Sequence, residues 1–420
     1  MKFIRENAEL VKKNAENKRM HVDIDGLLEV DEARLNALRE VEVLRKERNE
    51  TAEKMKSASA DERPALIARG KEIKEQLVAK EELFSVLSSK WSQELLKVPN
   101  MTHPDSPVGA DDGDNKAIAT FGEVAKLDFK PLTHVELAEK HDLIDFERGS
   151  KVAGAKFYFL KGKLAMLEQA LTQWVLKEMV AENYLPMITP DVAKDDVLVG
   201  TGFNPRGPET QIYSLEGTDL SLIGTAEIPL GGYHKDEILD EASLPVRYVG
   251  LSHCYRTEAG TYGRESYGLY RVHQFSKVEL FIFCAPEQSE AMHAELRRLE
   301  ERIFQKLELP FQVVDICTGD LGGPAYRKYD LEAWMWGRGD GKGGYGEVTS
   351  TSNCTDYQAR RLNVRIKRKD GTIEFAHTLN GTAAAMSRAL IAILENGQQA
   401  DGSIKIPAVL VPFTGFDTIG

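Results

Sequence analysis

The stretch VRYVGLSHCYRTEAGTYGRESYGLYRVHQFSKVELFIFC, residues 246–284, decides the fold. Its first part, 246–256, and its last part, 269–284, alternate apolar and polar residues with the period of two that is typical of β-strands. A polar, glycine-punctuated loop of twelve residues, 257–268, joins them. This pattern predicts an antiparallel hairpin. Its loop is longer than the connection requires, which is typical of functional loops.

Alternation places five residues with polar or stacking side chains on one face of the second strand, namely Arg271, His273, Phe275, Lys277 and Glu279. Such a face suits a ligand that carries phosphate and adenine, because arginine forms a bidentate fork for phosphate and phenylalanine offers a stacking surface. The alternative is a solvated strand face with salt bridges. The charged residues Arg256, Glu258 and Arg264 in the same hairpin favour the ligand-binding interpretation.

The stretch FAHTLNGTAAAMSRALIAILENG, residues 375–397, predicts a strand that leads into a helix. We expect the strand to reach Leu379, a turn at Asn380-Gly381, and a helix over about 382–396 with Thr382 as its N-cap and Gly397 as its end. Arg388 falls near the middle of that helix, where a fully buried helix would carry an apolar residue. Taken alone, Thr382 could be only a cap and Arg388 only a partly exposed cation.

Two further stretches carry candidate ligands. In LSLIGTAEIPL, residues 220–230, Thr225 and Glu227 lie in an apolar run, where a carboxylate usually has a cationic partner. The stretch YGEVTSTSNCTDYQARR, 345–361, supplies hard oxygen donors suited to Mg²⁺, although a Ser/Thr-rich edge strand is the simpler interpretation for most of them. A regular strand would point Glu347 and Ser350 to opposite faces, so we expect a bulge between them.

The N-terminal part predicts a helical hairpin over 28–97. In its second half an apolar stripe recurs at steps close to a heptad, formed by Leu66, Ile73, Leu77, Phe84, Leu87, Trp91 and Leu95. The segment SASADERP, 57–64, is the expected turn. Residues 31–100 hold 14 basic and 14 acidic residues, so the net charge of −12 falls on the rest of the chain. A nucleic-acid-binding arm and an oligomerisation coiled coil both fit this segment.

A boundary rich in Pro, Gly, Asp and Asn, residues 99–115, divides the chain into an N-terminal domain, 1–100, and a second domain, 101–420. The second domain alternates β-rich runs with helices at about 161–182, 287–306 and 382–396. The stretch GRGDGKGGYG, 337–346, predicts a flexible loop. No run of eighteen apolar residues and no signal-peptide core occurs, so we expect a cytoplasmic protein. The four cysteines are unclustered, so we expect no zinc site.

Taken together, these stretches resemble the bacterial-type seryl-tRNA synthetases along nearly the whole chain. ENYLPMITPDV, residues 182–192, resembles the first class II motif, a dimer-interface element. The 255–281 stretch resembles the second motif and 377–396 the third, while GTAE, KYDLEAWM and EVTSTSNCTDYQARR resemble stretches of the seryl enzymes. Several such motifs in one chain are a specific signal. The resemblance implies an α+β fold, with an antiparallel class II sheet flanked by helices and preceded by a coiled-coil hairpin.

The resemblance also implies the activity and the partners. The expected enzyme is a serine–tRNA ligase that forms seryl-adenylate from serine and ATP, with Mg²⁺ and without zinc. It transfers the seryl group to the 3′ end of the serine tRNA, and of the selenocysteine tRNA as well. The hairpin resembles the tRNA-binding arm of the family, and the expected assembly is a homodimer.

The family roles carry over to matching positions of this sequence. Arg256 and Arg388 are implied as catalytic residues, and Glu347 and Ser350 as ligands of Mg²⁺. The serine-binding set is Thr225, Ala226, Glu227, Glu279 and Thr382. The ATP-binding set is Arg256, Thr257, Glu258, Arg271, Phe275, Glu347, Val348, Thr349, Ser350 and Arg388.

Three positions depart from the family pattern: Trp336 stands where proline is usual, Thr382 where serine is common, and Gly224 where proline is common. None of these changes removes a charged residue of the site. Two other classes remain as alternatives. One is a synthetase-like ligase that charges a carrier protein, which would lack the long arm. The other is a non-catalytic coiled-coil interaction protein, which would have lost Arg256, Glu279 or Arg388.

Overall fold

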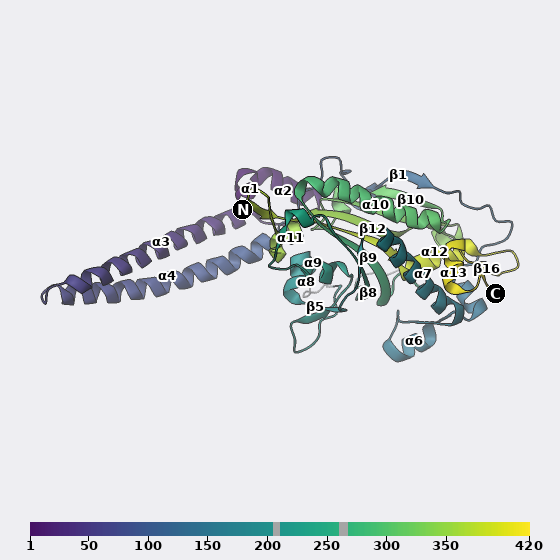
Figure 1. Cartoon of the computed structure of the whole chain (residues 1–420), viewed down its shortest axis with the longest axis horizontal. Helices are drawn as coiled ribbons and strands as arrows, with labels where there is room; N and C mark the ends of the chain where they lie inside the picture. Colours follow the sequence, from purple (N-terminus) through teal and green to yellow (C-terminus); the bar gives the residue numbers. More distant parts are fainter. Residues whose placement is uncertain (205–210, 260–267) are drawn as a thin grey trace. The chain divides into compact units, whose positions relative to one another are not determined.

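The computed structural model describes residues 1–204, 211–259 and 268–420, so Arg264 of the hairpin loop lies outside the described residues. The chain divides into two compact units, Met1–Met101 and Thr102–Gly420 (Figure 1). Within the described residues, no helix is both long and apolar enough to cross a membrane.

The first unit is a long antiparallel helical hairpin on a small helical base (Figure 1). The base contains α1 (Lys2–Glu6) and α2 (Ala8–Asn17), and the hairpin is formed by α3 (Ile24–Ser57) and α4 (Arg63–Lys97). Ile4, Val11, Ile24, Leu27 and Val98 form the core of the base.

The hairpin follows the predicted stripe. Ile73 and Leu77 are buried, as is Val41 on α3, and the other stripe residues of α4 are half-buried. Ion pairs link the two helices, with Arg45 to Glu81 at 2.7 Å and Arg69 to Glu47 at 2.6 Å. The predicted two-helix hairpin and its turn are therefore confirmed.

The second unit is built on an eight-stranded sheet, and the strand pairings are antiparallel except between β4 and β8. In spatial order the strands are β1 (Lys116–Phe121), β10 (Phe311–Asp315), β11 (Arg327–Met335), β12 (Gly344–Thr355), β15 (His377–Ala385), β9 (Gln274–Cys284), β8 (Val246–Tyr255) and β4 (Leu185–Ile188). The hairpin predicted from residues 246–284 is the β8–β9 pair, which runs in register from Val246 opposite Phe283 to Tyr255 opposite Gln274.

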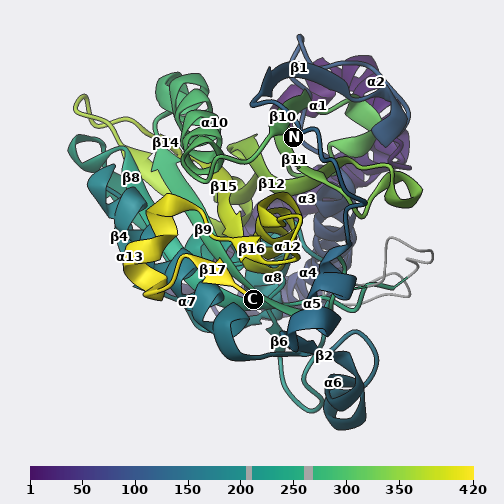
Figure 2. The same ribbon diagram turned by 90° about the vertical axis from the view of Figure 1, so that its right-hand side faces the viewer.

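The longer helices of this unit cover one face of the sheet, and the site lies on the other face, part of which two short helices cover. The main core joins α7 (Gly162–Ala181), α10 (Ser289–Lys306) and α12 (Met386–Gly397) to Val278, Leu280 and Ile282 of β9 (Figure 2). On the opposite face Phe281 and Phe283 pack against α9 (Glu227–Gly232) and α11 (Tyr357–Leu362). Because β9 alternates, Lys277 and Glu279 share the face of Phe281.

Smaller elements complete this unit. They are the helices α5 (His134–His141), α6 (Phe146–Ala153), α8 (Asp195–Thr201) and α13 (Val411–Thr414), and the strands β2 (Ile144–Asp145), β3 (Phe159–Leu160), β5 (Val192–Lys194), β6 (Leu220–Leu222), β7 (Ile238–Asp240), β13 (Arg365–Lys367), β14 (Ile373–Phe375), β16 (Ile404–Lys405) and β17 (Thr418–Ile419).

Two local predictions were wrong. Asn380-Gly381 does not turn the chain, because β15 continues to Ala385 and pairs with β12 and β9 on its two sides. Thr382 is therefore a strand residue and not an N-cap, and Arg388 lies in the first turn of α12 instead of its middle. The loop predicted over 337–346 is also shorter, since β12 begins at Gly344.

A third prediction also needs correction. β9 begins only at Gln274, so Arg271 and His273 precede the strand and do not continue its alternating face. The His273 ring contacts the backbone carbonyl of Arg256 through Nδ1 and packs near Phe157 and Tyr213.

Candidate active site

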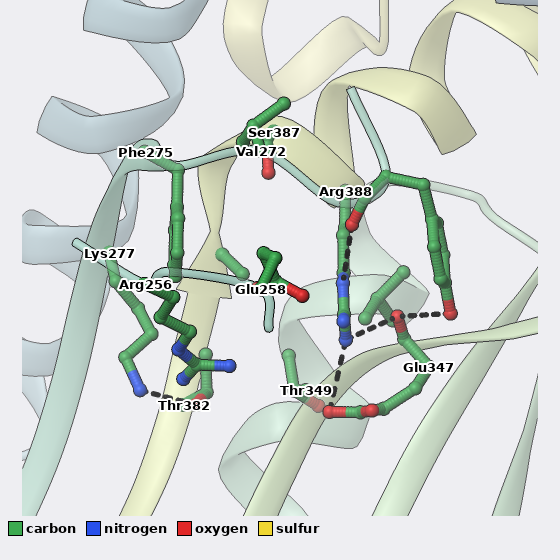
Figure 3. A pocket seen from close by; sticks show the side chains of 13 residues that line it. Arg256, Glu258, Val272, Phe275, Lys277, Glu347, Thr349, Thr382, Ser387 and Arg388 are labelled. Carbon is green, nitrogen blue, oxygen red and sulfur yellow. Dashed lines mark hydrogen bonds and ion pairs between the residues drawn. The ribbon is translucent and has the colours of Figure 1, made fainter. Parts of the chain in front are cut away.

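A pocket on the open face of the sheet collects residues from β8, β9, β12, β15 and the start of α12. Its lining includes eight of the site residues predicted from the sequence: Arg256, Glu258, Phe275, Glu347, Val348, Thr349, Thr382 and Arg388. In Figure 3 the Phe275 ring and the Arg388 side chain face each other across the pocket, with Glu258 between them. This leaves a slot between an aromatic ring and a guanidinium group, which suits a flat heteroaromatic ring.

Arg256 directly follows the last residue of β8, and it lines the pocket. Its Nε donates to the carbonyl of Gly224 at 3.3 Å, and its guanidinium lies 5.3 Å from the centroid of the Phe275 ring. Glu258 and Arg271 form an ion pair at 3.4 Å beside it. Glu258 adopts a left-handed backbone conformation with φ of 48°.

Arg388 is held by the backbone and side chain of Glu347. Its Nη1 lies 3.1 Å from both the carbonyl oxygen and Oε1 of Glu347, and its guanidinium carbon lies 4.6 Å from the centroid of the Tyr270 ring. Although burial opposes the charged forms, the mutual attraction raises the pKa of Arg388 and lowers the pKa of Glu347 to about 2. The pair therefore presents a fixed cation and a fixed anion to the pocket.

The bulge expected in β12 is present and is confirmed. Leu331 of β11 lies opposite Thr349, but the next residue, Glu332, lies opposite Glu347. Val348 is therefore the extra residue of β12. Val348 packs in the main core, and the Thr349 hydroxyl donates to Glu300 of α10 at 2.9 Å, so both point to the helix-covered face. Glu347 and Ser350 consequently share the open face.

Next to Ser350 lies a buried acid that sequence analysis missed. Asp330 is directly opposite Ser350 in the β11–β12 ladder, hydrogen-bonds to it, and forms an ion pair with Lys328 at 3.3 Å. Burial raises the pKa of Asp330 to about 7, against the opposing effect of Lys328. Its Oδ1 has no hydrogen-bond partner among the described residues. Carboxylates and a hydroxyl on one face form a set of hard oxygen donors, which fits a divalent cation such as Mg²⁺.

A second cluster lies deeper, between β9 and β15. Thr382 and Glu279 are cross-strand partners, and the Thr382 hydroxyl donates to Glu279 Oε2 at 3.1 Å. The ammonium group of Lys277 lies 2.6 Å from the same carboxylate oxygen. Glu279 is 1% exposed, so this is a buried charged group whose second oxygen remains for a further contact.

Glu227 begins α9 beside this cluster. Its Oε1 accepts hydrogen bonds from Gln358 at 2.7 Å and from Asn380 at 2.9 Å. Burial, and then the negative charge of Glu279, raise the pKa of Glu227 to about 7, while Lys277 opposes the shift. The Thr225 hydroxyl accepts from the backbone N–H of Glu227 at 3.3 Å.

Some predicted residues point elsewhere. The side chains of Ala226 and Val348 lie in apolar cores, so only their backbone groups are candidates for contacts with a ligand. Thr349 directs its hydroxyl to Glu300. The backbone N–H of Thr257 donates to Gln211, and Thr257 does not line the pocket.

Four further residues belong to the site and had no role assigned from the sequence: Lys277, Tyr270, Gln358 and Asn380. The signal for Asn380 was the period-two alternation of Thr378, Asn380 and Thr382, which the turn-like Asn-Gly pair obscured. Lys277 was placed on the correct face, but its pairing with Glu279 depends on side-chain geometry.

Comparisons with known proteins cover both units of the chain. Residues 1–102 match the family model of the seryl-tRNA synthetase N-terminal domain, and residues 212–397 match the class II tRNA synthetase core domain (G, H, P, S and T). The chain is 56% identical over 420 residues to the serine–tRNA ligase of Treponema denticola, covering 100% of this chain and 99% of that protein. It is 52% identical to the enzyme of Rubrobacter xylanophilus, covering 100% and 98%.

Solved structures give the same result. The crystal structure of seryl-tRNA synthetase from Pyrococcus horikoshii complexed with ATP matches with a TM-score of 0.91 and 41% identity, over 100% of this chain and 98% of that chain. The cytoplasmic serine–tRNA ligase of Naegleria fowleri in complex with AMP matches with a TM-score of 0.85 and 30% identity, over 98% and 95%.

Proposed function

The chain belongs to the seryl-tRNA synthetase family, and from that premise we propose that it activates serine with ATP and transfers the seryl group to the 3′ end of the serine tRNA and the selenocysteine tRNA. The activity is that of a serine–tRNA ligase. One observation carries the site assignment. The Phe275–Arg388 slot lies beside the buried Glu279–Thr382 pair, so one pocket can hold a nucleotide and a hydroxyl-bearing amino acid together.

ATP occupies the slot. Its adenine stacks between Phe275 and Arg388, with Glu258 in contact with the adenine edge. Arg271 and Arg388 hold the terminal phosphates, because guanidinium groups pair with phosphate through two parallel hydrogen bonds. Thr257, Val348 and Thr349 contribute through their backbone groups.

Serine occupies the deeper cluster. Its ammonium group meets Glu227, Thr225 and the Ala226 backbone, and its hydroxyl meets Glu279 and Thr382. The Arg256 guanidinium binds the serine carboxylate and the α-phosphate together. One carboxylate oxygen then attacks the α-phosphorus in line, which yields seryl-adenylate and pyrophosphate.

Arg256 stabilises the charge that passes between the reacting groups, and the enzyme supplies no nucleophile of its own. In the second step the terminal hydroxyl of tRNA attacks the adenylate carbonyl, and AMP leaves. Catalysis therefore rests on positioning and electrostatics.

Mg²⁺ is the cofactor we propose, and zinc is not required. Glu347 and Ser350 would hold it, which is supported by their shared face and by the adjacent unpaired oxygen of Asp330. When bound, the cation neutralises charge on the phosphates of ATP.

The arm, the assembly and the compartment complete the proposal. The helical hairpin of the N-terminal domain, 1–100, binds tRNA, and the catalytic domain spans 101–420. A homodimer is supported by β4, an edge strand with Leu185 58% and Ile188 88% exposed. The cytoplasm is the proposed compartment, because tRNA charging serves translation.

The test measures ATP–pyrophosphate exchange with each of the twenty amino acids in turn. Charging of total tRNA with serine is measured next. We expect exchange with serine and charging of the serine tRNA. Exchange without any tRNA charging would favour the carrier-protein ligase. No exchange at all would favour the non-catalytic interaction protein.

A further inference from the structure

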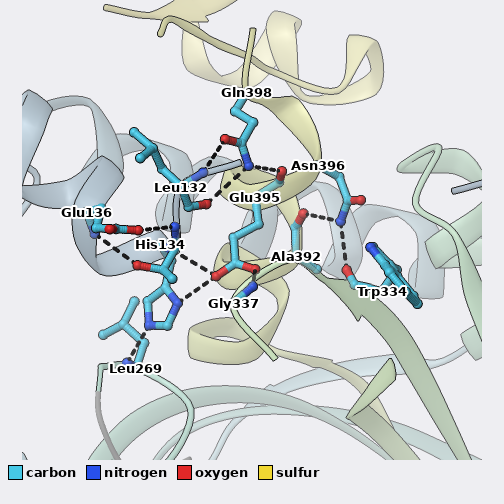
Figure 4. A network of polar contacts seen from close by, with 11 residues as sticks. Leu132, His134, Glu136, Leu269, Trp334, Gly337, Ala392, Glu395, Asn396 and Gln398 are labelled. Carbon is cyan, nitrogen blue, oxygen red and sulfur yellow. Dashed lines mark hydrogen bonds and ion pairs between the residues drawn. The ribbon is translucent and has the colours of Figure 1, made fainter. Parts of the chain in front are cut away.

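A buried carboxylate at the end of α12 joins three segments of the chain (Figure 4). Glu395 is 1% exposed. Its Oε1 accepts the backbone N–H of His134 at 2.8 Å and contacts Nδ1 of the His134 ring at 2.9 Å, while its Oε2 accepts the backbone N–H of Gly337 at 2.8 Å. The third segment is held through the histidine, because Nε2 of His134 accepts the backbone N–H of Leu269 at 3.1 Å.

These contacts determine the tautomer of the His134 ring. Since Nε2 accepts a hydrogen bond from an amide, the proton of the neutral ring lies on Nδ1 and is donated to Glu395. The ring therefore bridges a carboxylate on α12 and a backbone amide next to the loop of the β8–β9 hairpin. Removing either side chain would leave buried N–H groups without an acceptor.

Two glycines show how closely the segments fit. A Cβ atom at Gly337 would lie 2.9 Å from Glu395 Oε1, and one at Gly268, whose φ is +79°, would lie 2.1 Å from His134 Nε2. At both positions the backbone approaches the His134–Glu395 pair so closely that a side chain would displace it. The pair is therefore a tight joint between segments.

The segments held by this joint lead directly into the ATP pocket. Leu269 is followed by Tyr270 and Arg271, while Gly337 is followed by Arg338. The Arg338 guanidinium carbon lies 4.8 Å from the centroid of the Tyr270 ring, and the catalytic Arg388 lies 4.6 Å from the same centroid. The two segments thus meet at one aromatic ring.

The helix itself completes the connection. Arg388 and Glu395 are seven residues apart on α12, which places them about two turns apart on one face. The same helix therefore carries the phosphate-binding arginine at one end and the joint at the other. The segment that starts at Gly337 runs on to Glu347, the partner of Arg388.

We propose that Glu395 and His134 are positioning residues for ATP. They touch no substrate, but they set the positions of Tyr270, Arg271 and Arg338 around Arg388 and so shape the phosphate end of the pocket. The residues that receive serine belong to β9, β15 and the start of α9. The inference rests on the proposed function, because it concerns the ATP half of that same site.

The experiment compares two variants that disturb the joint from opposite sides. Glu395→Gln keeps the shape of the side chain, but its NH₂ group faces one of the N–H donors that the carboxylate accepts. Gly337→Ala places a methyl group against the carboxylate. In both variants we expect the KM for ATP in the exchange reaction to rise roughly tenfold, with the KM for serine at saturating ATP within about twofold of the unmodified enzyme.

A spectroscopic measurement accompanies the kinetics. Trp336 directly precedes Gly337, so ATP binding should change tryptophan emission in the unmodified enzyme. The same change should require a correspondingly higher ATP concentration in both variants.

Asp315→Asn is the matched control. Asp315 is 6% exposed and pairs with Arg327 at 2.8 Å near the far edge of the sheet, so this variant should lose stability without a selective effect on ATP. Equal rises in both KM values, or a lower melting temperature with both KM values unchanged, would overturn the positioning role. If the unmodified enzyme shows no serine-dependent exchange, the proposed function itself fails. If only the ATP-selective effect is missing, the inference alone fails.

Discussion

At the scale of single residues, we propose that Glu279 decides which amino acid the pocket accepts. One of its oxygens is occupied by Lys277 and Thr382, and the other remains for the hydroxyl of serine. Bound alanine would leave that buried oxygen unpaired. Sites built to hydrogen-bond a substrate hydroxyl reject the analogue without the hydroxyl by roughly 10⁴-fold or more. We expect Glu279→Ala to raise the KM for serine and to narrow the serine/alanine ratio in ATP–pyrophosphate exchange.

The control for this prediction removes the charge but keeps the shape. Glu279→Gln retains a hydrogen-bond acceptor, although it leaves Lys277 without its anionic partner. The rise in the KM for serine should therefore be smaller than in Glu279→Ala. The KM for ATP should change little in either variant. Efficient alanine activation by the unmodified enzyme would contradict the role of Glu279.

With Glu227 as the proposed partner of the serine ammonium group, we predict that serine binding depends on pH. Its pKa in the folded protein is about 7, so the carboxyl is protonated below that value and cannot pair with the serine ammonium group. We therefore expect kcat/KM for serine to fall as the pH decreases through about 7. Because the folded pKa lies above the ordinary value, ionisation of Glu227 costs stability, and that cost appears as the pH rises from about 4.5 through 7.

The comparison variant is Glu227→Gln, which carries no titrating group. It should show a lower kcat/KM for serine and a profile without the step near neutral pH. An unchanged step in that variant would mean that another group titrates there.

At the scale of elements, the sequence predicted the β8–β9 hairpin and the helical hairpin because each has a long periodic pattern. It failed where local chemistry and tertiary pairing disagree. Asn380-Gly381 is a strong turn signal in isolation, but β15 lies between β9 and β12, and their ladders hold its backbone extended through Ala385. The roles of Thr382 and Arg388 came from the family resemblance and did not depend on the wrong boundary.

The bulge of β12 is the element that brings the two proposed Mg²⁺ ligands to one face. It turns Val348 and Thr349 to the helix-covered face and leaves Glu347 and Ser350 on the open face. We expect activity to require Mg²⁺, and Ser350→Ala to raise the Mg²⁺ concentration needed for half-maximal exchange. Asp330 could not be found from the sequence, because its place opposite Ser350 depends on the strand register.

A metal analysis distinguishes an enzyme that requires Mg²⁺ from one that requires zinc. Chelation of Mg²⁺ should abolish exchange, and its return should restore it. All four cysteines are buried and free, so a zinc chelator should have no effect. Stoichiometric zinc, with activity lost on its removal, would contradict the assignment.

At the scale of the whole molecule, the exposed edge of the sheet predicts a homodimer. β4 is the last strand of the eight-stranded sheet and carries the exposed Leu185 and Ile188. A closed twofold assembly covers such an edge. Sedimentation at micromolar concentration should give the dimer mass, and Ile188→Lys should shift the equilibrium towards the monomer. A monomeric mass for the unmodified protein would count against the prediction.

The arm belongs to the same scale, and we expect it to act in only one of the two reactions of the enzyme. α3 has 34 residues, which at 1.5 Å per residue give about 50 Å of reach. Several cations of the hairpin are paired with neighbouring acids, such as Arg45 with Glu81. In the part of the chain that the structure describes, the exposed Arg48, Lys54 and Arg63 have no ion-pair partner, and they lie towards the turn. These cations suit the phosphate backbone of a helical RNA, which proteins recognise mostly by shape.

We therefore predict that the arm serves transfer and not activation. The base must remain, because Ile24, Leu27 and Val98 form its core and Arg34 stacks on Trp91 at 4.5 Å. A variant with residues 36–88 replaced by a short linker should keep serine-dependent exchange within about tenfold of the intact enzyme, since none of the residues assigned to the pocket lies in the arm. Charging of tRNA should fall far more. A milder variant, Arg48→Glu with Lys54→Glu, should weaken charging and leave exchange unchanged. Equal losses in both reactions would show that the arm supports folding, and full charging without the arm would show that tRNA is recognised elsewhere.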